Sequence, residues 1–502
     1  MNDKITDTKS KALRINLDPR PYGSLAEIGA GQEVAAFFFK AGAASQTIAK
    51  TMSAYDMTFS DAIYGKEEHG RYVSESRLHK MLDREYSLLE ERLRDVRGER
   101  STFFAFADTV VTINFQKTNQ GHGWMGVQFQ LHPFAKPNKF ILHVRMMEKE
   151  ATAQQQALGI MGVNMIYACI YYHSNIEVFM DSLMDNLTTE RIKIDKISLT
   201  GPDFKHIDNR VLALMLVQKG YTNAALFDKS GEVREPADLF YKKHIVALRG
   251  RFRPCTKVNI DMFETGVREF EQEEDVEKDK IVQVAELTLN NLRSEGEINY
   301  QDFLYRADLL CSLGKNVLIS NYQEYYRLVD FFNRYTKLKI GIILGPYNLA
   351  DIFNEKYYTN LKGGILESFA LLFSRNVKLY VYPALKPDGS LYNAETFTLP
   401  EHLRYLYMYL FENNKIKDIR GYQHDILHIF SDKVIDMLKK NTPGWEDMVP
   451  KEVEIAIKEK NLFGYTADEI QTREHHQNDF AQKTNYPYFH LNFSSFTISK
   501  HN

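Results

Sequence analysis

Three short apolar runs, NVLIS (316–320), KIGIIL (339–344) and VKLYVY (377–382), decide the fold of the second half of the chain. Each run has the length and the β-branched residues of a buried strand. The segments between them, Tyr322–Tyr335 and Gly363–Phe373, carry apolar residues at helical spacing. Strands that alternate with helices predict a parallel sheet.

The corners that follow these strands are candidate ligand contacts. Asn321 and Gly345 come directly after the first two runs. In open parallel sheets the ligand crevice lies outside the carboxyl ends of the strands. We therefore predict that Asn321 and Gly345 contact a bound ligand.

The first 150 residues have a different pattern. A helical segment comes first, and β-prone runs near 103–115, 124–131 and 140–146 follow, separated by turn residues. This spacing predicts an antiparallel meander. From residue 151 a long apolar helix precedes apolar runs at 192–199 and 244–248, which we interpret as a first parallel unit.

An acidic run at 271–277 resists packing and marks a boundary between the two α/β units. The predicted fold class is therefore α/β, with Rossmann-like parallel sheet units in the middle and C-terminal parts, after the helical segment and the meander. An alternating Phe/Ser segment near the end of the chain is interpreted as part of a tail. The four predicted parts are residues 1–150, 151–270, 271–470 and 471–502.

Composition excludes several classes of protein. The net charge of −3 among 502 residues lacks the basic excess of a nucleic-acid or anionic-membrane binder. The longest apolar stretch, 157–172, is shorter than the ~20 residues that span a bilayer. The three cysteines form no Cys-x-x-Cys pair, and His424 and His428 lack the partners of a zinc site. We expect a cytoplasmic protein without a metal site, a membrane segment or a nucleic-acid partner.

The clearest chemical signal is the basic segment from Lys242 to Lys257, which holds six Lys or Arg residues and no acidic one. It follows an apolar strand, turns at Gly250 and leads into a predicted helix. A glycine turn lets the backbone approach a phosphate, and a helix N-terminus supplies N–H donors. The alternative is an ordinary charged loop between a strand and a helix.

Residues 250–263, GRFRPCTKVNIDMF, resemble the first signature of the nucleotidyltransferase superfamily, Gly-x-Phe-x-Pro-x-Thr/His-x-x-His followed by an apolar helix. Four residues match this signature: Gly250, Phe252, Pro254 and Thr256. Asn259 stands where the family has its catalytic histidine. The whole chain is similar to a bacterial family labelled nicotinamide or nicotinate mononucleotide adenylyltransferase-like.

The resemblance implies a nucleotide-binding protein that binds ATP or a mononucleotide, with weak or no catalysis. Arg251, Arg253 and Lys257 would neutralise phosphate charge beside the four matching residues, and an active enzyme would use Mg²⁺. Asn259 carries no positive charge, so stabilisation of the leaving pyrophosphate would fall.

Two alternatives come from other classes. One is a non-catalytic structural or regulatory homo-oligomer built on a nucleotide-fold core, which the 13% aromatic content favours. The other is an S-adenosylmethionine-dependent methyltransferase, because Glu27-Ile28-Gly29-Ala30-Gly31 resembles the first motif of that class. Pro21–Leu25 before it is a poor strand sequence, and Glu33 replaces a third glycine, so we interpret Gly29 and Gly31 as a turn. A homo-oligomer is expected in either case.

Overall fold

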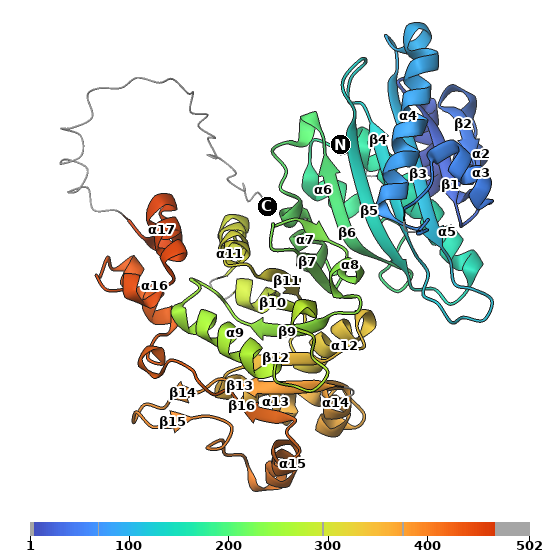
Figure 1. Ribbon diagram of the computed structural model, residues 1–502. Helices are drawn as coiled ribbons and strands as arrows, with labels where there is room; N and C mark the ends of the chain where they lie inside the picture. The colour runs from blue at the N-terminus through green and yellow to red at the C-terminus, as the bar shows by residue number, and fades with distance from the viewer. Residues whose placement is uncertain (1–4, 69, 294–295, 374–375, 467–502) are drawn as a thin grey trace, which may run out of the picture.

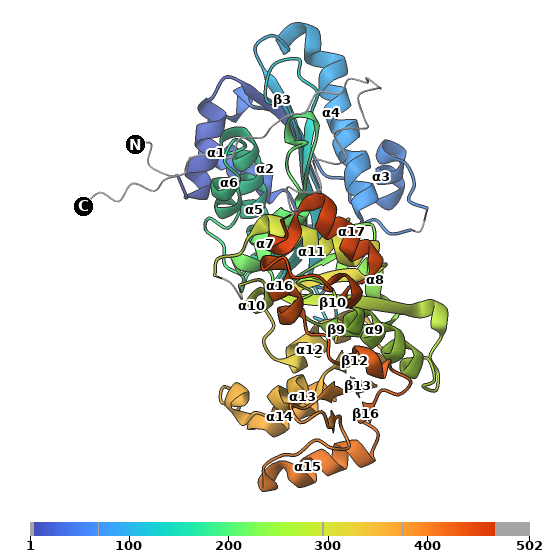
Figure 2. The same ribbon diagram turned by 90° about the vertical axis from the view of Figure 1, so that its left-hand side faces the viewer.

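The computed structural model describes residues 5–68, 70–293, 296–373 and 376–466. Its strands form two large sheets that follow one another along the molecule (Figure 1). In the perpendicular view, β3 of the first sheet and the helix α4 lie above β9, β12 and β13 of the second sheet (Figure 2). The predicted tail, residues 471–502 with its Phe/Ser segment, lies outside the described residues.

The first sheet has six strands in the order β2-β1-β3-β4-β5-β6. β1 runs parallel to β2 and β3, and each pair from β3 to β6 is antiparallel. The predicted meander is therefore confirmed as β3, β4 and β5. The strands are β1 (Pro21–Ile28), β2 (Ile48–Met52), β3 (Thr102–Val111), β4 (His122–Phe129), β5 (Asn138–Met146) and β6 (Ile192–Thr200).

Helices cover both faces of the first sheet. Leu25 and Phe106 face a core shared with α1, α2, α5 and α6, whereas Ala26 and Ala107 pack under Leu78 of α4. This alternation follows the period of two of a strand. The helices are α1 (Thr8–Leu17), α2 (Glu33–Ala41), α3 (Met57–Tyr64), α4 (Glu75–Arg97), α5 (Ala151–Tyr171) and α6 (Ile176–Leu183).

The second sheet has eight strands in the order β16-β13-β12-β9-β10-β11-β7-β8. In this order, each neighbouring pair of strands from β16 across to β11 is parallel. β7 and β8 extend the sheet beyond β11 as antiparallel strands. The strands are β7 (Ala224–Phe227), β8 (Val233–Arg234), β9 (His244–Arg249), β10 (Ile281–Thr288), β11 (Asn316–Ser320), β12 (Ile340–Leu344), β13 (Val377–Val381) and β16 (Ile416–Asp418).

Counted from β9, the six parallel strands lie in the order 3-2-1-4-5-6, which is the strand order of the Rossmann fold. This confirms the predicted α/β fold class. Every residue of β11 and β12 is buried, as expected for strands covered on both faces. The point where the strand order reverses lies between β9 and β12, and ligands bind at such a point.

Helices also cover both faces of the second sheet, and α7 packs against strands of both sheets, β6 and β7. A hairpin of β14 (Ala384–Leu385) and β15 (Leu391–Tyr392) lies apart from the large sheets. The helices are α7 (Asn209–Gln218), α8 (Pro236–Phe240), α9 (Lys257–Phe270), α10 (Leu289–Leu292), α11 (Tyr300–Ser312), α12 (Tyr325–Tyr335), α13 (Pro346–Ile352), α14 (Gly364–Leu372), α15 (Glu401–Glu412), α16 (Ser431–Lys439) and α17 (Lys451–Lys460).

Two details differ from the sequence interpretation. The run at 192–199 forms β6 of the first sheet, antiparallel to β5, rather than a strand of a middle parallel unit. Pro21–Leu25, interpreted as a poor strand, belongs to β1 inside the first sheet.

Strands from both sides of residue 270, β9 and β10, pair in one sheet. Along the described chain, no helix is long and apolar enough to cross a membrane.

Candidate functional site

The loop from Gly250 to Thr256 lies at the carboxyl end of β9 and leads directly into α9. β9 is the first strand of the Rossmann order, so the loop lies beside the point where that order reverses. Phe252 anchors the loop because its side chain is buried, and its φ is +45°. Gly250 lies against the Phe252 ring, where a Cβ would come within 3.0–3.2 Å.

Asn259 has a structural role in the first turn of α9. Thr256 caps the helix, and the Asn259 backbone N–H donates to Thr256 Oγ1 at 3.4 Å. Asn259 Oδ1 in turn accepts from the Thr256 backbone N–H at 2.9 Å. This reciprocal pair is a capping box. The residue at the family's histidine position therefore closes the helix end with a neutral side chain.

The arginines of this segment have acidic partners. Arg249 holds the fully buried Glu286 through Nε at 2.8 Å and Nη2 at 3.1 Å. Arg253 donates from Nε to Asp302 at 2.7 Å, and its side chain is largely buried. The sequence resemblance assigned Arg253 to a phosphate, whereas the structure pairs it with Asp302, because a buried guanidinium needs a counter-charge.

Two cations of the loop remain accessible. The Arg251 side chain is 48% exposed, and its partner Asp432, 3.0 Å away, is 74% exposed. Such a surface pair contributes little free energy and can open. Lys257, at the first position of α9, is exposed and has no ionic partner in the described part of the chain. Arg251 and Lys257 are therefore the side chains that can reach a bound anion.

The other basic residues of the segment lie elsewhere. Lys242 and Lys243 precede β9, at its amino end. Six residues of strand separate them from the loop by about 20 Å. The run of six cations in the sequence therefore forms two groups at opposite edges of the sheet.

Asn321 and Gly345 lie at the same carboxyl edge as the loop. Asn321 follows β11, and its backbone N–H and Nδ2 donate to the backbone and side-chain oxygens of Asn223 at 3.0 and 3.3 Å. Gly345 follows β12 and precedes α13. The structure thus gathers the predicted corners on one edge, whereas contact with a ligand stays a prediction.

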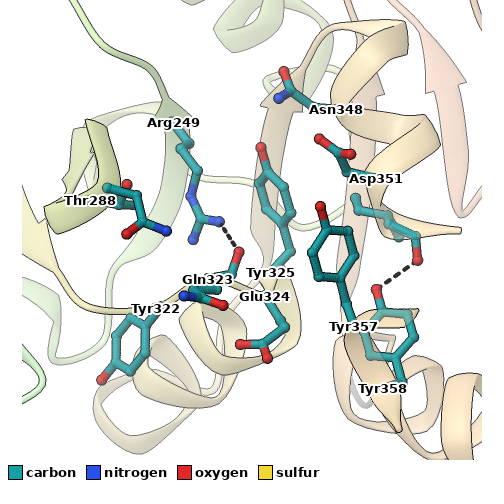
Figure 3. A pocket seen from close by; sticks show the side chains of 12 residues that line it. Arg249, Thr288, Tyr322, Gln323, Glu324, Tyr325, Asn348, Asp351, Tyr357 and Tyr358 are labelled. Atoms are coloured by element: carbon teal, nitrogen blue, oxygen red, sulfur yellow. Dashed lines mark hydrogen bonds between the residues drawn. The ribbon is translucent and has the colours of Figure 1, made fainter. Parts of the chain in front are cut away.

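A cavity of about 210 Å³ opens at this edge, between the ends of β9, β10 and β11 and the helix α13. Arg249 stacks on Tyr325, with the guanidinium carbon 4.2 Å from the ring centroid, and donates to the Gln323 carbonyl oxygen (Figure 3). Asn348 and Asp351 face the cavity from α13 (Figure 3). The lining therefore combines aromatic faces with amide and carboxylate hydrogen-bonding groups.

Sequence reasoning missed these cavity residues and the acidic partners. Glu286, Asp302 and Asp432 lie 37, 49 and 181 residues from the arginines they bind. No local spacing connects groups so far apart. The sequence offered one signal, because Tyr322 and Tyr325 follow closely after the predicted corner at Asn321.

The glycine corner after β1 has the strand–turn–helix context that the sequence interpretation denied. Gly29 has φ +103°, and a Cβ there would lie 1.9 Å from the Val110 carbonyl oxygen. Glu27 accepts from the backbone N–H groups of Val34 and Ala35 at 3.0 and 2.9 Å. The first-turn donors of α2 are therefore already bound by a carboxylate, which disfavours an anionic ligand at this corner.

No protein-family description and no curated protein sequence matches the chain. Among solved structures, the nicotinic acid mononucleotide adenylyltransferase of Plasmodium falciparum complexed with APC is 12% identical, covers 45% of this chain and 98% of its own, and has a TM-score of 0.28. The competence/damage inducible protein CihA of Agrobacterium tumefaciens is 17% identical over 34% of this chain and 98% of its own, with a TM-score of 0.24.

A competence-damaged protein (CinA) superfamily protein of Enterobacter cloacae is 10% identical over 36% of this chain and 96% of its own, with a TM-score of 0.21. TM-scores this low carry no argument about function. The fold assignment rests on the strand order and the loop geometry. The chain is similar to these proteins in part, and no family assignment follows.

Proposed function

We propose that the protein binds ATP or a mononucleotide at the carboxyl edge of its second sheet, in the manner of a nucleotidyltransferase with weak or absent transfer activity. One observation carries the proposal. The loop that matches the nucleotidyltransferase signature follows the first strand of a 3-2-1-4-5-6 sheet and ends at the capped N-terminus of α9. This is the place where α/β proteins of this strand order bind nucleotides.

The phosphate end of the ligand would lie at the loop. The N-terminus of the 14-residue helix α9 carries a partial positive charge, and its cap is neutral. Arg251 can leave its exposed partner Asp432, and Lys257 has no ionic partner to leave among the residues that the structure describes. Together these groups would neutralise a phosphate, whereas Arg253 would keep Asp302 in place.

The nucleoside end would lie in the cavity that begins at Arg249, the residue before Gly250. Its volume of about 210 Å³ is below the usual range of about 300–1,000 Å³ for whole ligands, so it suits one part of a nucleotide. The Tyr325 and Tyr357 rings can flank a flat base. Asn348 and Asp351 can accept or donate hydrogen bonds to a base edge or a ribose hydroxyl.

Catalysis would be weak because the loop holds Asn259 where a cation is needed. In the described parts of the chain, no cluster of three or more His, Cys, Asp or Glu residues is arranged to hold a metal. Any Mg²⁺ would therefore arrive bound to the phosphates of the nucleotide. The chain's own residues would bind and orient the ligand.

Calorimetric titration of the full chain with ATP and with nicotinamide mononucleotide tests the proposal. The double variant Arg251→Ala/Lys257→Ala should lose at least about tenfold in affinity, because each charge-assisted contact contributes about 1.5–3 kcal/mol. The matched control is Lys242→Ala/Lys243→Ala, which removes two cations from the opposite end of β9 and should change affinity less than about twofold. Equal losses in both variants would refute the assignment, as would no binding by the unmodified protein at millimolar ligand.

Pyrophosphate release measures the weak-transfer part of the proposal. Replacing Asn259 with His returns a cationic group to the helix end and should raise any adenylyl transfer. If Asn259→His binds ATP unchanged and releases no more pyrophosphate than the unmodified protein, the protein is a binder rather than a weakened enzyme.

We also propose that the protein assembles as a homo-oligomer. Tyr405 and Tyr409 on α15 are 77% and 66% exposed, and large exposed aromatic side chains are typical of interfaces. Light scattering should show a mass above 58.4 kDa, and a strict monomer would contradict this.

A further inference from the structure

A second cavity, of about 690 Å³, lies where the first sheet meets the second unit. β4 and β5 supply one wall, the start of α4 another, and α8 with the last residue of α12 the third. Its volume is within the range of small-molecule sites. It lies apart from the Gly250 loop and shares no lining residue with the cavity at Arg249.

A β-bulge builds the sheet side of this cavity. His143 pairs with Lys196 and Val144 pairs with Ile194, so Asp195 is an extra residue in β6. Bulges re-aim side chains and are over-represented beside functional sites. Here the Asp195 carboxylate accepts from Arg145 Nε at 2.5 Å and Nη2 at 3.0 Å. Arg145 is thus neutralised although it lines the cavity.

Two histidines, His143 and His122, lie in a row beside Asp195. Asp195 Oδ2 lies 3.7 Å from His143 Nδ1, and His143 Nε2 lies 3.2 Å from His122 Nδ1. With its proton on Nδ1, the side nearer the carboxylate, His143 would accept at Nε2 from His122 Nδ1–H. His122 Nε2 is then a hydrogen-bond acceptor. Burial, together with His143, lowers the pKa of His122 to about 4, so this ring stays neutral near pH 7.

Glu235, Tyr335 and Trp124 are further lining groups of the cavity. Glu235 is only 8% exposed, and no Lys or Arg pairs with its carboxyl within the described ranges. Burial raises the pKa of Glu235, and the nearby His143 and the Ala237 backbone N–H offset this only in part. Tyr335 Oη is buried without a hydrogen-bond partner, and Trp124 packs its ring against His143.

We propose that this cavity binds a small organic cation with N–H donors, an alkylammonium or guanidinium group, with Glu235 as its counter-charge. His122 Nε2 and Tyr335 Oη would accept hydrogen bonds from the cation, and Trp124 would form part of the wall. Arg71 and Asp238, both exposed at the rim, carry opposite charges. Glu75, which also lines the cavity, is paired with Lys196. Glu235 is therefore the buried charge of the cavity without a Lys or Arg partner among the described residues, and it would decide which ligand enters.

The test uses agmatine, ethylammonium and guanidinium as probes on the full chain, with urea as the neutral analogue of guanidinium and with acetate and inorganic phosphate as anions. The two tryptophans are Trp124 and Trp445, so fluorescence in a Trp445→Phe background reports Trp124 alone. A cation should change this fluorescence saturably below about 10 mM, whereas urea and the anions should not.

The decisive variant is Glu235→Gln, which keeps the side-chain shape and removes the charge. It should weaken agmatine binding by at least about tenfold. Asp238→Asn, at the exposed rim, is the matched control and should change affinity by less than about threefold. Circular dichroism establishes that both variants fold. Unchanged binding by Glu235→Gln, tighter binding of an anion, or no saturable binding of any cation would overturn the proposal.

Discussion

One strand of each sheet, β1 in the first and β9 in the second, ends at a glycine corner and leads into a helix, but the two corners differ in what fills the helix N-terminus. After β1, the buried Glu27 carboxylate accepts from Val34 and Ala35 in the first turn of α2. After β9, Thr256 and Asn259 close α9 with neutral groups. The Glu27 side-chain oxygens occupy the first corner, whereas the second remains open to an external anion. A glycine turn at a strand end is therefore insufficient to predict a phosphate site.

Among changes at the two corners, replacing Glu27 with Ala should lower the free energy of unfolding most. The change leaves two buried backbone N–H groups without acceptors, and each unsatisfied group costs about 1–3 kcal/mol. We expect the free energy of unfolding, measured by urea denaturation, to fall by about 2–6 kcal/mol. Gln32→Ala, at the exposed position before α2, should cost little, because its side chain makes no capping bond. Equal costs would mean that Glu27 does not hold the helix.

A smaller effect is expected from Asp108→Asn. Asp108 is the register neighbour of Glu27 in β3, and burial, reinforced by Glu27, raises the pKa of Asp108. A raised folded-state pKa stabilises the fold below the unfolded value near 3.9, and this contribution is lost as the pH rises through the folded value. At pH 8 the Asn variant should therefore be more stable than the unmodified protein. Urea denaturation between pH 5 and 8 checks this sign, and a variant that is less stable at pH 8 would contradict it.

Replacing Thr256 with Ala should have the smallest of these effects on stability. Loss of a hydroxyl cap costs about 1 kcal/mol, less than the loss of a carboxylate that accepts two bonds. Thr256→Ser, which keeps the hydroxyl, is the control. If Thr256→Ala costs as much as Glu27→Ala, the two helix ends are not closed differently.

Local sequence signals predicted the second corner because its determinants are adjacent. An apolar run, Gly250 and a Thr256 cap occur within a dozen residues. The first corner was missed because Pro21 and Gly23 weaken the strand pattern. The structure shows why Gly23 is there: a Cβ would lie 2.4 Å from the Phe104 carbonyl oxygen of the neighbouring strand.

The sequence pattern could not predict ion pairs between distant segments of the chain. The partners of Arg249 and Arg253 come from distant segments, and nothing near them in the sequence marks the pairing. The cavity beside His143 depends on one extra residue in β6, Asp195, and on the approach of α8 from the second unit. Such features arise only when the strands pair in register.

Hydrogen–deuterium exchange with saturating ATP tests the central claim most directly, because it locates the ligand on one of the two corners. Backbone amides from Gly250 through the first turn of α9 should gain protection, since the phosphate would accept from them and close the loop. Amides from Gly29 to Ala35 should exchange unchanged, because Glu27 already binds the first-turn donors of α2. Protection confined to Gly29–Ala35, or no protection at either corner, would contradict the account.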